Sequence, residues 1–360
     1  MRVHQMTTGL SYGDAITNHI FAIDRRLKAW GLESRVFATY IEERLGNVAQ
    51  LDSEYVPFMA HPDDLLVYHY SIYSPNLSLY ERSSNRKIVV YHNITPPEFF
   101  HGYDAALEAD CRRGREALPR LADCDLGVGD SDYNRRELVA VGVPAERTAV
   151  LPIFLDLAGL RRTPLNQALY DRVRGSGRVN LLFVSRLVPS KACEDLLKIL
   201  AAYRAALDDR VHLWLAGRPL IPRYQTYLAR LTERLGLTEY VTFTDRVSLS
   251  DLCTLYAAAD VYLCASRHEG FSVPLLESMT FDLPILAYNT AAVPDTLGTA
   301  GVLFNAFDYP VLAATARTLA TDADLRRAVV AGQRQRLADF APERVEAELR
   351  GILARVGVRV

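Results

Sequence analysis

Cysteine is scarce in this chain and shows no pattern of pairing. The five cysteines are scattered, and none forms a CxxC pair or lies near a histidine at the spacing of a zinc site. This distribution argues against a secreted disulfide framework and favours a reducing compartment. The sequence also lacks an apolar leader at its start and any apolar run of membrane-spanning length. We therefore expect a cytoplasmic protein, for which peripheral contact with the inner face of a membrane stays open.

An excess of charge of one sign is absent as well. Lys and Arg number 41 and Asp and Glu 43, so the formal net charge is -2. Without a basic surplus there is no electrostatic case for a nucleic-acid partner. Hydrophobic residues make up 49% and charged residues 23% of the 360 positions, which is typical of globular proteins. A chain of this length predicts two domains of moderate size.

Short β-branched segments alternate with longer amphipathic segments, which is the pattern of parallel sheets wrapped by helices. In the first half the expected strands are 3–7, 35–39, 65–69, 87–91 and 126–129. In the second half they are 180–184, 212–216, 241–244, 261–264, 284–287 and 302–304. The sequence thus predicts an α/β protein with two Rossmann-like, doubly wound parallel sheets.

We expect an N-terminal domain at 1–160 and a C-terminal domain at 161–335, with the polar stretch 156–178 as the linker. The clearest early helix is expected at 14–30, and residues 336–360 form a helix that could cross back to the first domain. Two such domains facing each other would place the carboxyl ends of both strand sets at one cleft, where a ligand should bind. Periplasmic sugar-binding proteins share this geometry, so the fold alone leaves the function open.

The strongest functional signal is the segment 266–277, which follows an expected strand and begins a helix near Pro274. Backbone N–H groups over 270–275 would lie at the positive end of that helix, where anions bind. Glu269 and Glu277 flank them, eight positions apart. Carboxylates would repel a diphosphate, so we expect both to accept hydrogen bonds from hydroxyl groups. The donor-binding candidates between them are Gly270, Phe271, Ser272 and Val273.

This segment resembles the E-x(7)-E motif of the retaining glycosyltransferases with GT-B architecture, specifically glycosyltransferase family four, the group 1 glycosyltransferases. Phe281-Asp282-Leu283 stands where the family often has a glycine. The resemblance implies two Rossmann-like sheets facing across a cleft, with 1–160 on the acceptor side and 161–335 binding the nucleotide-sugar donor. In the family the first Glu contacts the donor sugar and the second binds the ribose, which implies these roles for Glu269 and Glu277.

Two cations, Arg186 and Lys191, lie five positions apart after the strand expected at 180–184. Cations that converge at a strand end can neutralise a diphosphate as it binds and as it leaves. The segment is similar to the family's G-R-x(4)-K-G pattern, with Ser185 and Ala192 in place of the two glycines. The resemblance therefore implies that Arg186 and Lys191 are both catalytic and donor-binding.

In the first half, the loop from Thr7 to Asp14 follows a strand and begins a helix, but it is not a GxGxxG loop, so nothing supports a nicotinamide cofactor. Gly13 matches the glycine that the family places near the donor phosphates. Histidines follow two strands at His69 and His92, and His92 matches the family's histidine close to the donor sugar. The implied catalytic residues are thus Glu269, His92, Arg186 and Lys191.

Three smaller features complete the candidate site. Gly217 resembles the family's hydrophobic-Gly turn, and Arg246 follows a strand end where the family's backbone recognises the base. Asp130-Ser131-Asp132 superficially reads as a metal-binding DxD motif, but it lies in the first half, and we interpret both acids as helix capping. We therefore expect no metal site and no other cofactor.

The resemblance implies transfer of a hexose-type sugar from UDP- or GDP-sugar to a hydroxyl acceptor with retention, in polysaccharide, glycolipid or glycoside biosynthesis. Two alternatives stay open: a non-catalytic sugar-nucleotide-binding protein, and another GT-B enzyme such as a sugar-nucleotide epimerase or a phosphorylase. Release of nucleoside diphosphate only when an acceptor is present would separate transfer from both. Arginines 112, 113, 115 and 120 are either an ordinary helix surface or a contact to an anionic bilayer carrying a lipid-linked acceptor.

Overall fold

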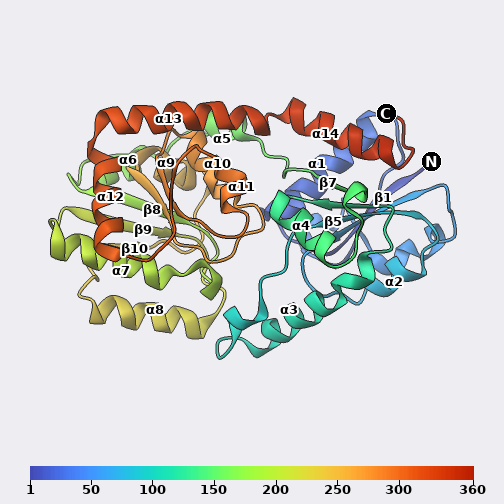
Figure 1. The fold of residues 1–360 in the computed structure, drawn as a ribbon, viewed down its shortest axis with the longest axis horizontal. Helices are drawn as coiled ribbons and strands as arrows, with labels where there is room; N and C mark the ends of the chain where they lie inside the picture. Colours follow the sequence, from blue (N-terminus) through green and yellow to red (C-terminus); the bar gives the residue numbers. More distant parts are fainter. The chain divides into compact units, whose positions relative to one another are not determined.

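The computed structural model describes all residues from Met1 to Val360. Contacts within the chain divide it into two compact units, each with its own sheet (Figure 1). The first unit comprises Met1–Glu98, Ala105–Leu155 and Phe340–Val360, and the second comprises Phe99–Asp104 and Asp156–Asp339. The domain ranges 1–160, 161–335 and 336–360 stay a prediction. No helix of the structure combines the length and the apolarity needed to cross a bilayer.

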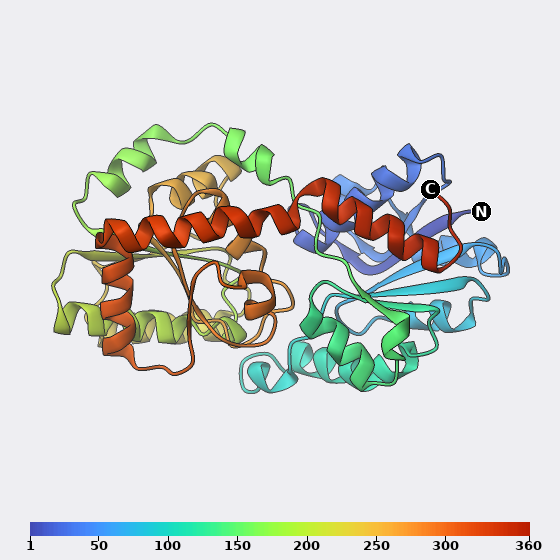
Figure 2. The ribbon, with the colours of Figure 1, turned by 45° about the horizontal axis from the view of Figure 1, so that its top comes forward.

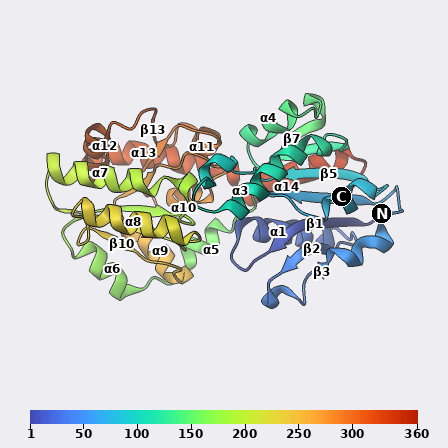
Figure 3. The ribbon, with the colours of Figure 1, turned by 90° about the horizontal axis from the view of Figure 1, so that it is seen from below.

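The first unit is built on a seven-stranded parallel sheet in the order β3-β2-β1-β4-β5-β6-β7, part of which can be followed in Figure 3. Its strands are β1 (Val3–Leu10), β2 (Val36–Ile41), β3 (Gln50–Leu51), β4 (Leu65–Tyr70), β5 (Arg86–Tyr91), β6 (Leu126–Gly129) and β7 (Thr148–Val150). Its helices are α1 (Ala15–Ala29), α2 (Leu77–Arg82), α3 (Ala105–Ala117), α4 (Asp132–Ala140) and α14 (Pro342–Arg355). All five strands expected in this half are present; the sequence pattern misses only the short edge strands β3 and β7.

Helix α1 forms where the sequence predicts it. The Asp14 carboxylate accepts a hydrogen bond of 3.0 Å from the Thr17 N–H and so caps the first turn, while Arg26 and Lys28 lie in the last turn near the negative end of the helix dipole. Ile20, Ile23 and Leu27 are buried at 2% exposure or less. The helix therefore holds one apolar face against the sheet.

The core of the first unit joins two parts of the chain that are far apart in the sequence. Val3 of β1 and Leu27 of α1 belong to one buried cluster with Leu349 and Leu353 of α14. Figure 2 shows α14 lying along the strands of this unit, which also holds both chain ends. Residues 342–358 are thus an integral part of the first unit's core.

The second unit is built on a six-stranded parallel sheet in the order β10-β9-β8-β11-β12-β13. Its strands are β8 (Val179–Val184), β9 (Val211–Ala216), β10 (Val241–Phe243), β11 (Val261–Cys264), β12 (Ile285–Tyr288) and β13 (Val302–Phe304). Its longer helices are α7 (Cys193–Ala206), α8 (Pro222–Arg234), α9 (Leu249–Ala258), α10 (Val273–Thr280), α12 (Tyr309–Thr321) and α13 (Ala323–Leu337), with the short α11 at Val293–Leu297. All six strands expected in this half are present.

The polar stretch 156–178, which we expected as the linker, lies within the second unit and is largely helical. Helices α5 (Leu157–Arg162) and α6 (Gln167–Arg174) occupy most of it, each capped by the side chain that precedes it, Asp156 and Asn166. Leu169 and Val173 of α6 are buried, so this polar stretch still contributes an apolar helix face. The sequence pattern did not predict this helix, because only two buried apolar residues stand among many polar ones.

In both sheets the strand order reverses at one point, between β1 and β4 in the first unit and between β8 and β11 in the second. The loops after two such strands run to opposite sides, which leaves a crevice at their carboxyl ends where ligands bind in open α/β sheets. In the second unit the loop after β8 carries Arg186 and Lys191, and the loop after β11 carries Glu269. The predicted donor residues therefore lie at a topological switch point.

Candidate functional site

The loops after β8 and β11 are held together by direct contacts. The Arg267 N–H donates to the Ser190 carbonyl at 2.8 Å, and Lys191 Nζ donates to the His268 carbonyl at 3.3 Å. Lys191 Nζ also lies 2.8 Å from Glu269 Oε2, and both side chains are mostly buried, at 15% and 11% exposure. Two residues that stand 78 positions apart in the sequence thus form one ion pair.

Arg186 differs from Lys191 because its side chain is exposed and makes no hydrogen bond or ion pair within the protein. Its backbone is nevertheless fixed: the Ser185 N–H donates to Ala216 O and the Leu187 N–H to Arg218 O, both at 3.0 Å. The loop therefore continues the pairing of β8 with β9 beyond the strand ends. A cation on a fixed backbone with all its N–H donors free is suited to bind an anion.

Gly217 makes this continuation of the two strands sterically feasible. Its φ is +145°, and a Cβ atom at this position would lie 1.8 Å from the Ser185 carbonyl oxygen. The structure thus gives Gly217 a packing role directly beneath the Arg186 loop. Its role as a donor-binding residue stays a prediction.

The structure explains the two departures from the family's glycine pattern differently. Ala192 adopts left-handed dihedrals, φ +49° and ψ +46°, before α7, so here glycine would remove a real conformational cost. Ser185 is not among the residues with positive φ, so at that position a side chain costs nothing in backbone conformation. The charges at 186 and 191 are present in either case.

The start of α10 offers fewer free amides than the sequence predicts. Ser272 takes the left-handed conformation (φ +70°), the Leu275 N–H donates to the Ser272 carbonyl at 3.1 Å, and Pro274 has no N–H. The amides of Ser272 and Val273 remain without a partner in the protein. An anion at this helix start would therefore be bound by these two amides rather than by the whole 270–275 segment. The roles of Gly270 and Phe271 stay predictions.

Glu277 lies one turn further along α10, in contact with α9. Its Oε2 accepts a hydrogen bond of 2.7 Å from the Tyr256 hydroxyl, and its Oε1 accepts none from the protein. Burial raises the pKa of Glu277, and the Tyr256 hydrogen bond partly opposes this rise. The carboxylate can thus accept a hydrogen bond from a ligand hydroxyl through one oxygen while the other is anchored.

The sequence analysis did not identify Asp195, which binds Arg267 of the loop that carries Glu269. Asp195 of α7 is fully buried and accepts hydrogen bonds from Arg267 (2.7 Å), Lys198 (3.0 Å) and Tyr309 (2.8 Å). Burial alone would raise its pKa, but these three donors together hold the pKa of Asp195 below its usual value. An acid on the otherwise apolar face of 193–206 is the signal that could have revealed it.

Arg246 follows β10. The residue before it, Asp245, pairs through its backbone with Gly217, whose neighbour Arg218 pairs with Leu187 of the Arg186 loop. Gly217 forms an isolated bridge with Asp245, and the Arg246 N–H donates to the Asp245 side chain at 2.8 Å. Asp245 itself has a positive φ of 56°. The geometry places Arg246 at the carboxyl end of the sheet, and its contact with a base stays a prediction.

In the first unit, the loop with Gly13 uses most of its amides internally. The Ser11 N–H donates to Thr17 Oγ1 (3.0 Å), the Tyr12 N–H to Glu42 (2.8 Å) and the Asp14 N–H to the Ser11 carbonyl (3.2 Å). Gly13 has a φ of +80°, and its N–H has no partner in the protein. One amide is thus left for a phosphate, and the donor contact of Gly13 stays a prediction.

His92 is part of a hydrogen-bonded row that runs across four neighbouring strands. His92 Nδ1 lies 2.8 Å from Asp130 Oδ2, His92 Nε2 lies 2.9 Å from His69 Nδ1, and His69 Nε2 lies 3.0 Å from Gln5 Oε1. All four side chains are buried. Both ring nitrogens of His92 are therefore engaged inside the first unit, and this arrangement offers no support for the predicted contact of His92 with a donor sugar.

The row also fixes where its protons lie. Gln5 Nε2 donates to the Ile20 carbonyl at 3.1 Å, so Gln5 Oε1 faces His69 and can only accept. Burial, reinforced by the neighbouring His92, holds the pKa of His69 well below its usual value, so the ring is neutral and carries its single hydrogen on Nε2. His69 Nδ1 then accepts, His92 Nε2 donates, and one further proton is shared between His92 Nδ1 and Asp130.

The contact between Asp130 and His92 corrects the interpretation of the Asp130-Ser131-Asp132 motif. The capping residue of α4 is Ser131, whose hydroxyl accepts from the Asn134 N–H, and not either acid. Asp130 bonds His92, and Asp132 pairs with Arg135 and Arg136 on the helix surface. Capping was the wrong reason for these acids, because the partner of Asp130 comes from another strand.

Comparison with known proteins agrees with this geometry. Residues 178–322 match the family model described as glycosyl transferases group 1. The chain is 30% identical over 192 residues to a GDP-mannose-dependent alpha-(1-6)-phosphatidylinositol monomannoside mannosyltransferase of Mycobacterium tuberculosis, which covers 51% of this chain and 49% of that protein. It is 31% identical over 237 residues to a D-inositol 3-phosphate glycosyltransferase of Geodermatophilus obscurus, covering 62% and 51%. The matches span about half the length of these curated relatives.

Solved structures show the fold over the whole chain. Anabaena Alr3699/HepE in complex with UDP-glucose has a TM-score of 0.75 and 20% identity, covering 99% of both chains. The two parallel sheets of seven and six strands with their helices are thus a GT-B glycosyltransferase fold. Residues 178–322, which form most of the second unit, are thus similar to the group 1 glycosyltransferases.

Proposed function

We propose that this chain transfers a hexose from a nucleoside-diphosphate sugar to a hydroxyl acceptor, with retention of configuration and without a metal ion. The observation that carries the proposal is the loop pair at the switch point of the second unit. It presents an unpartnered Arg186 on a fixed backbone and, in the same loop, Lys191 paired with Glu269. These residues lie inside the segment that matches the family model.

The proposed mechanism stabilises the charge of the leaving diphosphate. As the glycosidic C–O bond breaks, negative charge develops on the leaving phosphate, and Arg186 together with the Ser272 and Val273 amides stabilises it. Lys191 has three N–H donors, of which Glu269 and the His268 carbonyl take two, so one remains for a phosphate oxygen. The leaving phosphate accepts the proton of the attacking hydroxyl, so no protein nucleophile is needed.

The two carboxylates bind polyol groups in this proposal. Glu269, held by Lys191, accepts a hydrogen bond from a sugar hydroxyl, and the free Oε1 of Glu277 accepts one from the ribose. The mechanism rests on residues of the second unit alone. His92 is left out of it because both of its ring nitrogens are engaged.

The relatives suggest which substrates to test first. The name of the mycobacterial relative contains GDP-mannose and phosphatidylinositol monomannoside, and that of the Geodermatophilus relative contains D-inositol 3-phosphate. The Anabaena structure is a complex with UDP-glucose. A membrane contact through α3 and the turn after it has little support. The arginines there each pair with a carboxylate: Arg112 with Glu108, Arg113 with Asp110, Arg115 with Glu137 and Arg120 with Glu81.

The test is a thermal-shift panel of nucleoside diphosphates and their sugars, followed by turnover with the stabilising donor. We expect nucleoside diphosphate to be released only with an acceptor, and the product to keep the donor's anomeric configuration by NMR. Arg186→Ala and Lys191→Ala should each lower kcat by about 10²–10³-fold. Arg230→Gln, an exposed arginine of α8, should leave kcat unchanged.

Each alternative predicts a different result. A sugar-nucleotide-binding protein would be stabilised by a donor and would release no diphosphate with any acceptor. An epimerase would convert the donor without an acceptor. Near-native turnover in both Arg186→Ala and Lys191→Ala would contradict the proposed mechanism directly.

A further inference from the structure

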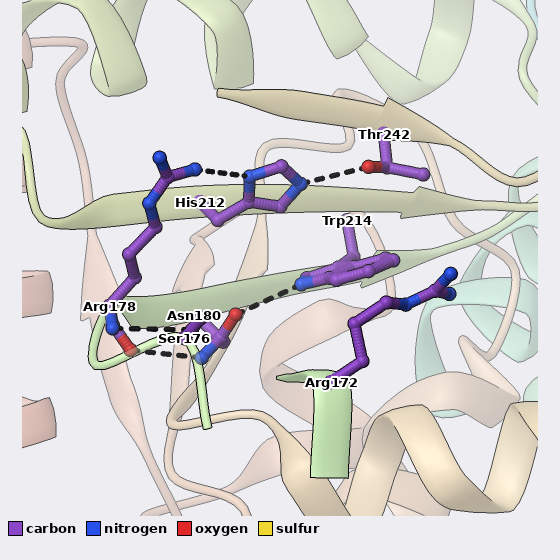
Figure 4. Close-up of a pocket in the computed structure, with 7 residues that line it drawn as sticks. All are labelled: Arg172, Ser176, Arg178, Asn180, His212, Trp214 and Thr242. Atoms are coloured by element: carbon purple, nitrogen blue, oxygen red, sulfur yellow. Dashed lines mark hydrogen bonds between the residues drawn. The ribbon is translucent and has the colours of Figure 1, made fainter. Parts of the chain in front are cut away.

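The second unit has a cavity far from the loops described above. It has a volume of about 290 Å³ and is lined by Arg172, Ser176, Arg178, Asn180, His212, Trp214 and Thr242 (Figure 4). Asn180 and His212 lie at the amino-terminal ends of β8 and β9, whereas Arg186 lies beyond the carboxyl-terminal end of β8. Six residues of extended chain between Asn180 and Arg186 span roughly 20 Å. The cavity is therefore separate from the proposed donor site.

The hydrogen bonds of the lining fix which groups remain free. Arg178 Nη1 lies 3.4 Å from His212 Nδ1, and His212 Nε2 lies 2.8 Å from Thr242 Oγ1 (Figure 4). Burial, with the charges of Arg178 and Arg172, lowers the pKa of His212 to about 4, so the ring is neutral at pH 7. Its Nδ1 then accepts from Arg178, its Nε2–H donates to Thr242, and the Thr242 hydroxyl hydrogen is left as a donor.

The two arginines of the lining keep unused donors as well. Arg172 makes no hydrogen bond and holds its guanidinium 5.7 Å from the Trp214 ring centroid. Arg178 uses Nη1 for His212 and for the Glu239 carbonyl, and its Nε and Nη2 groups bond nothing in the protein. Figure 4 shows the two arginines on opposite sides of the imidazole and indole rings. No acidic residue belongs to the lining.

We propose that this cavity binds a phosphorylated small molecule, with Arg172 and the Thr242 hydroxyl on the phosphate, the Trp214 side on the organic group, and the charge of Arg178 across the rings adding to the attraction for the anion. A lining with two cations, one free hydroxyl donor and no carboxylate selects an anion. The volume lies near the lower end of the roughly 300–1,000 Å³ typical of small-molecule sites, which leaves room beyond a bare phosphate. This site is independent of the proposed transferase reaction.

Tryptophan fluorescence gives a direct test, because Trp30 and Trp214 are the only two tryptophans. In the full chain carrying Trp30→Phe, Trp214 is the sole reporter, and it lies in the cavity wall. Titration with phenyl phosphate should change its emission with saturation, inorganic phosphate should compete, and the neutral benzyl alcohol should have no effect. Arg186→Ala, at the proposed donor site and outside the cavity lining, should leave the titration unchanged, because the two sites are separate.

Substitutions decide whether the cavity residues are responsible. In the Trp30→Phe background, Arg172→Gln should weaken phenyl phosphate binding at least tenfold, and Arg178→Lys should weaken it less, because the charge is kept. Arg230→Gln, on α8 and outside the lining, should bind like the parent. Because Arg172 is exposed and makes no hydrogen bond, its replacement should leave folding intact. Saturable binding unchanged by Arg172→Gln, equal binding of benzyl alcohol, or no emission change at millimolar phenyl phosphate would each overturn the proposal.

Discussion

In the first unit, polar side chains of four neighbouring strands bond one another in a row from Asp130 to Gln5, and none of these groups is exposed. In the second unit, the loop after β8 carries the exposed Arg186 and also Lys191, whose ammonium group uses two of its three N–H donors within the protein. Both arrangements place titratable side chains at or just beyond the carboxyl ends of parallel strands. The difference teaches that a charged residue at this place indicates a ligand site only when its donors are not already satisfied by the protein.

The largest loss of stability should come from changing the backbone beneath the Arg186 loop of the second unit. In Gly217→Ala the new methyl carbon would lie 1.8 Å from the Ser185 carbonyl oxygen, so the β8–β9 continuation cannot persist. We expect a loss of more than about 4 kcal/mol in the free energy of unfolding, measured by denaturant titration of Trp214 fluorescence. Gly236→Ala is the control: its φ is +66° but nothing lies within 4 Å, so a loss of about 1 kcal/mol is expected. Equal losses in the two variants would show that the Arg186 loop does not need Gly217.

A substitution in the buried row from Asp130 to Gln5 in the first unit should lower the free energy of unfolding by nearly as much. In Asp130→Asn the amide Nδ2–H can still donate to His92 Nδ1, but this buried contact loses its charged partner and becomes a neutral hydrogen bond. We expect about 3 kcal/mol of destabilisation in denaturant unfolding at pH 7.5. Asp132→Asn, two positions along and paired only at the surface, should cost less than about 1 kcal/mol. If Asp130→Asn costs no more than this control, the row is not the closed unit described above.

A pH-dependent effect of intermediate size is expected at His4. Its ring lies near Phe37, Tyr55 and Phe58, both of its nitrogens lack partners, and burial lowers its pKa to about 4. The unfolded chain binds a proton below pH 6.5 that the folded chain excludes, so this residue lowers stability as the pH falls from 6.5 towards 4. His4→Phe should therefore stabilise the protein by about 2 kcal/mol more at pH 5 than at pH 8. Denaturant unfolding at both pH values tests this, and the exposed His61→Gln should show no such difference.

The smallest loss of stability is expected at the Tyr256 hydroxyl, which donates a hydrogen bond to Glu277. Tyr256→Phe removes the hydrogen bond to Glu277, so the already raised pKa of Glu277 should rise further. Because the charged form is the one that loses a donor, the cost of about 1 kcal/mol should be full near pH 8 and shrink as the pH falls through that pKa. Tyr262→Phe is the matched control, since its hydroxyl donates to the Val184 carbonyl and to no acid. A cost at Tyr256 that does not change with pH would mean that Glu277 is not the charged partner.

Periodicity and turn residues were enough to predict the longer strands of both sheets and helix α1. They could not predict β3 or β7, because two or three residues carry no period, nor the helices at 157–174, whose apolar stripe is too narrow. Local motifs were enough to select the loops with Arg186, Lys191 and Glu269, which lie together in the structure, while the roles of these residues stay predictions. Asp195 and Asp130 were not, because their roles depend on partners from other strands and helices.

The placement of α14 in the first unit has a consequence for how the protein is made. A ribosome delivers residues 156–339 as one uninterrupted stretch, so the second unit can complete its folding while synthesis continues. The first unit begins with β1 but must wait for Leu349 and Leu353, and until then the apolar surface around Val3 and Leu27 has no cover. During translation the apolar surface around Val3 and Leu27 is therefore exposed for longer than the core of the second unit.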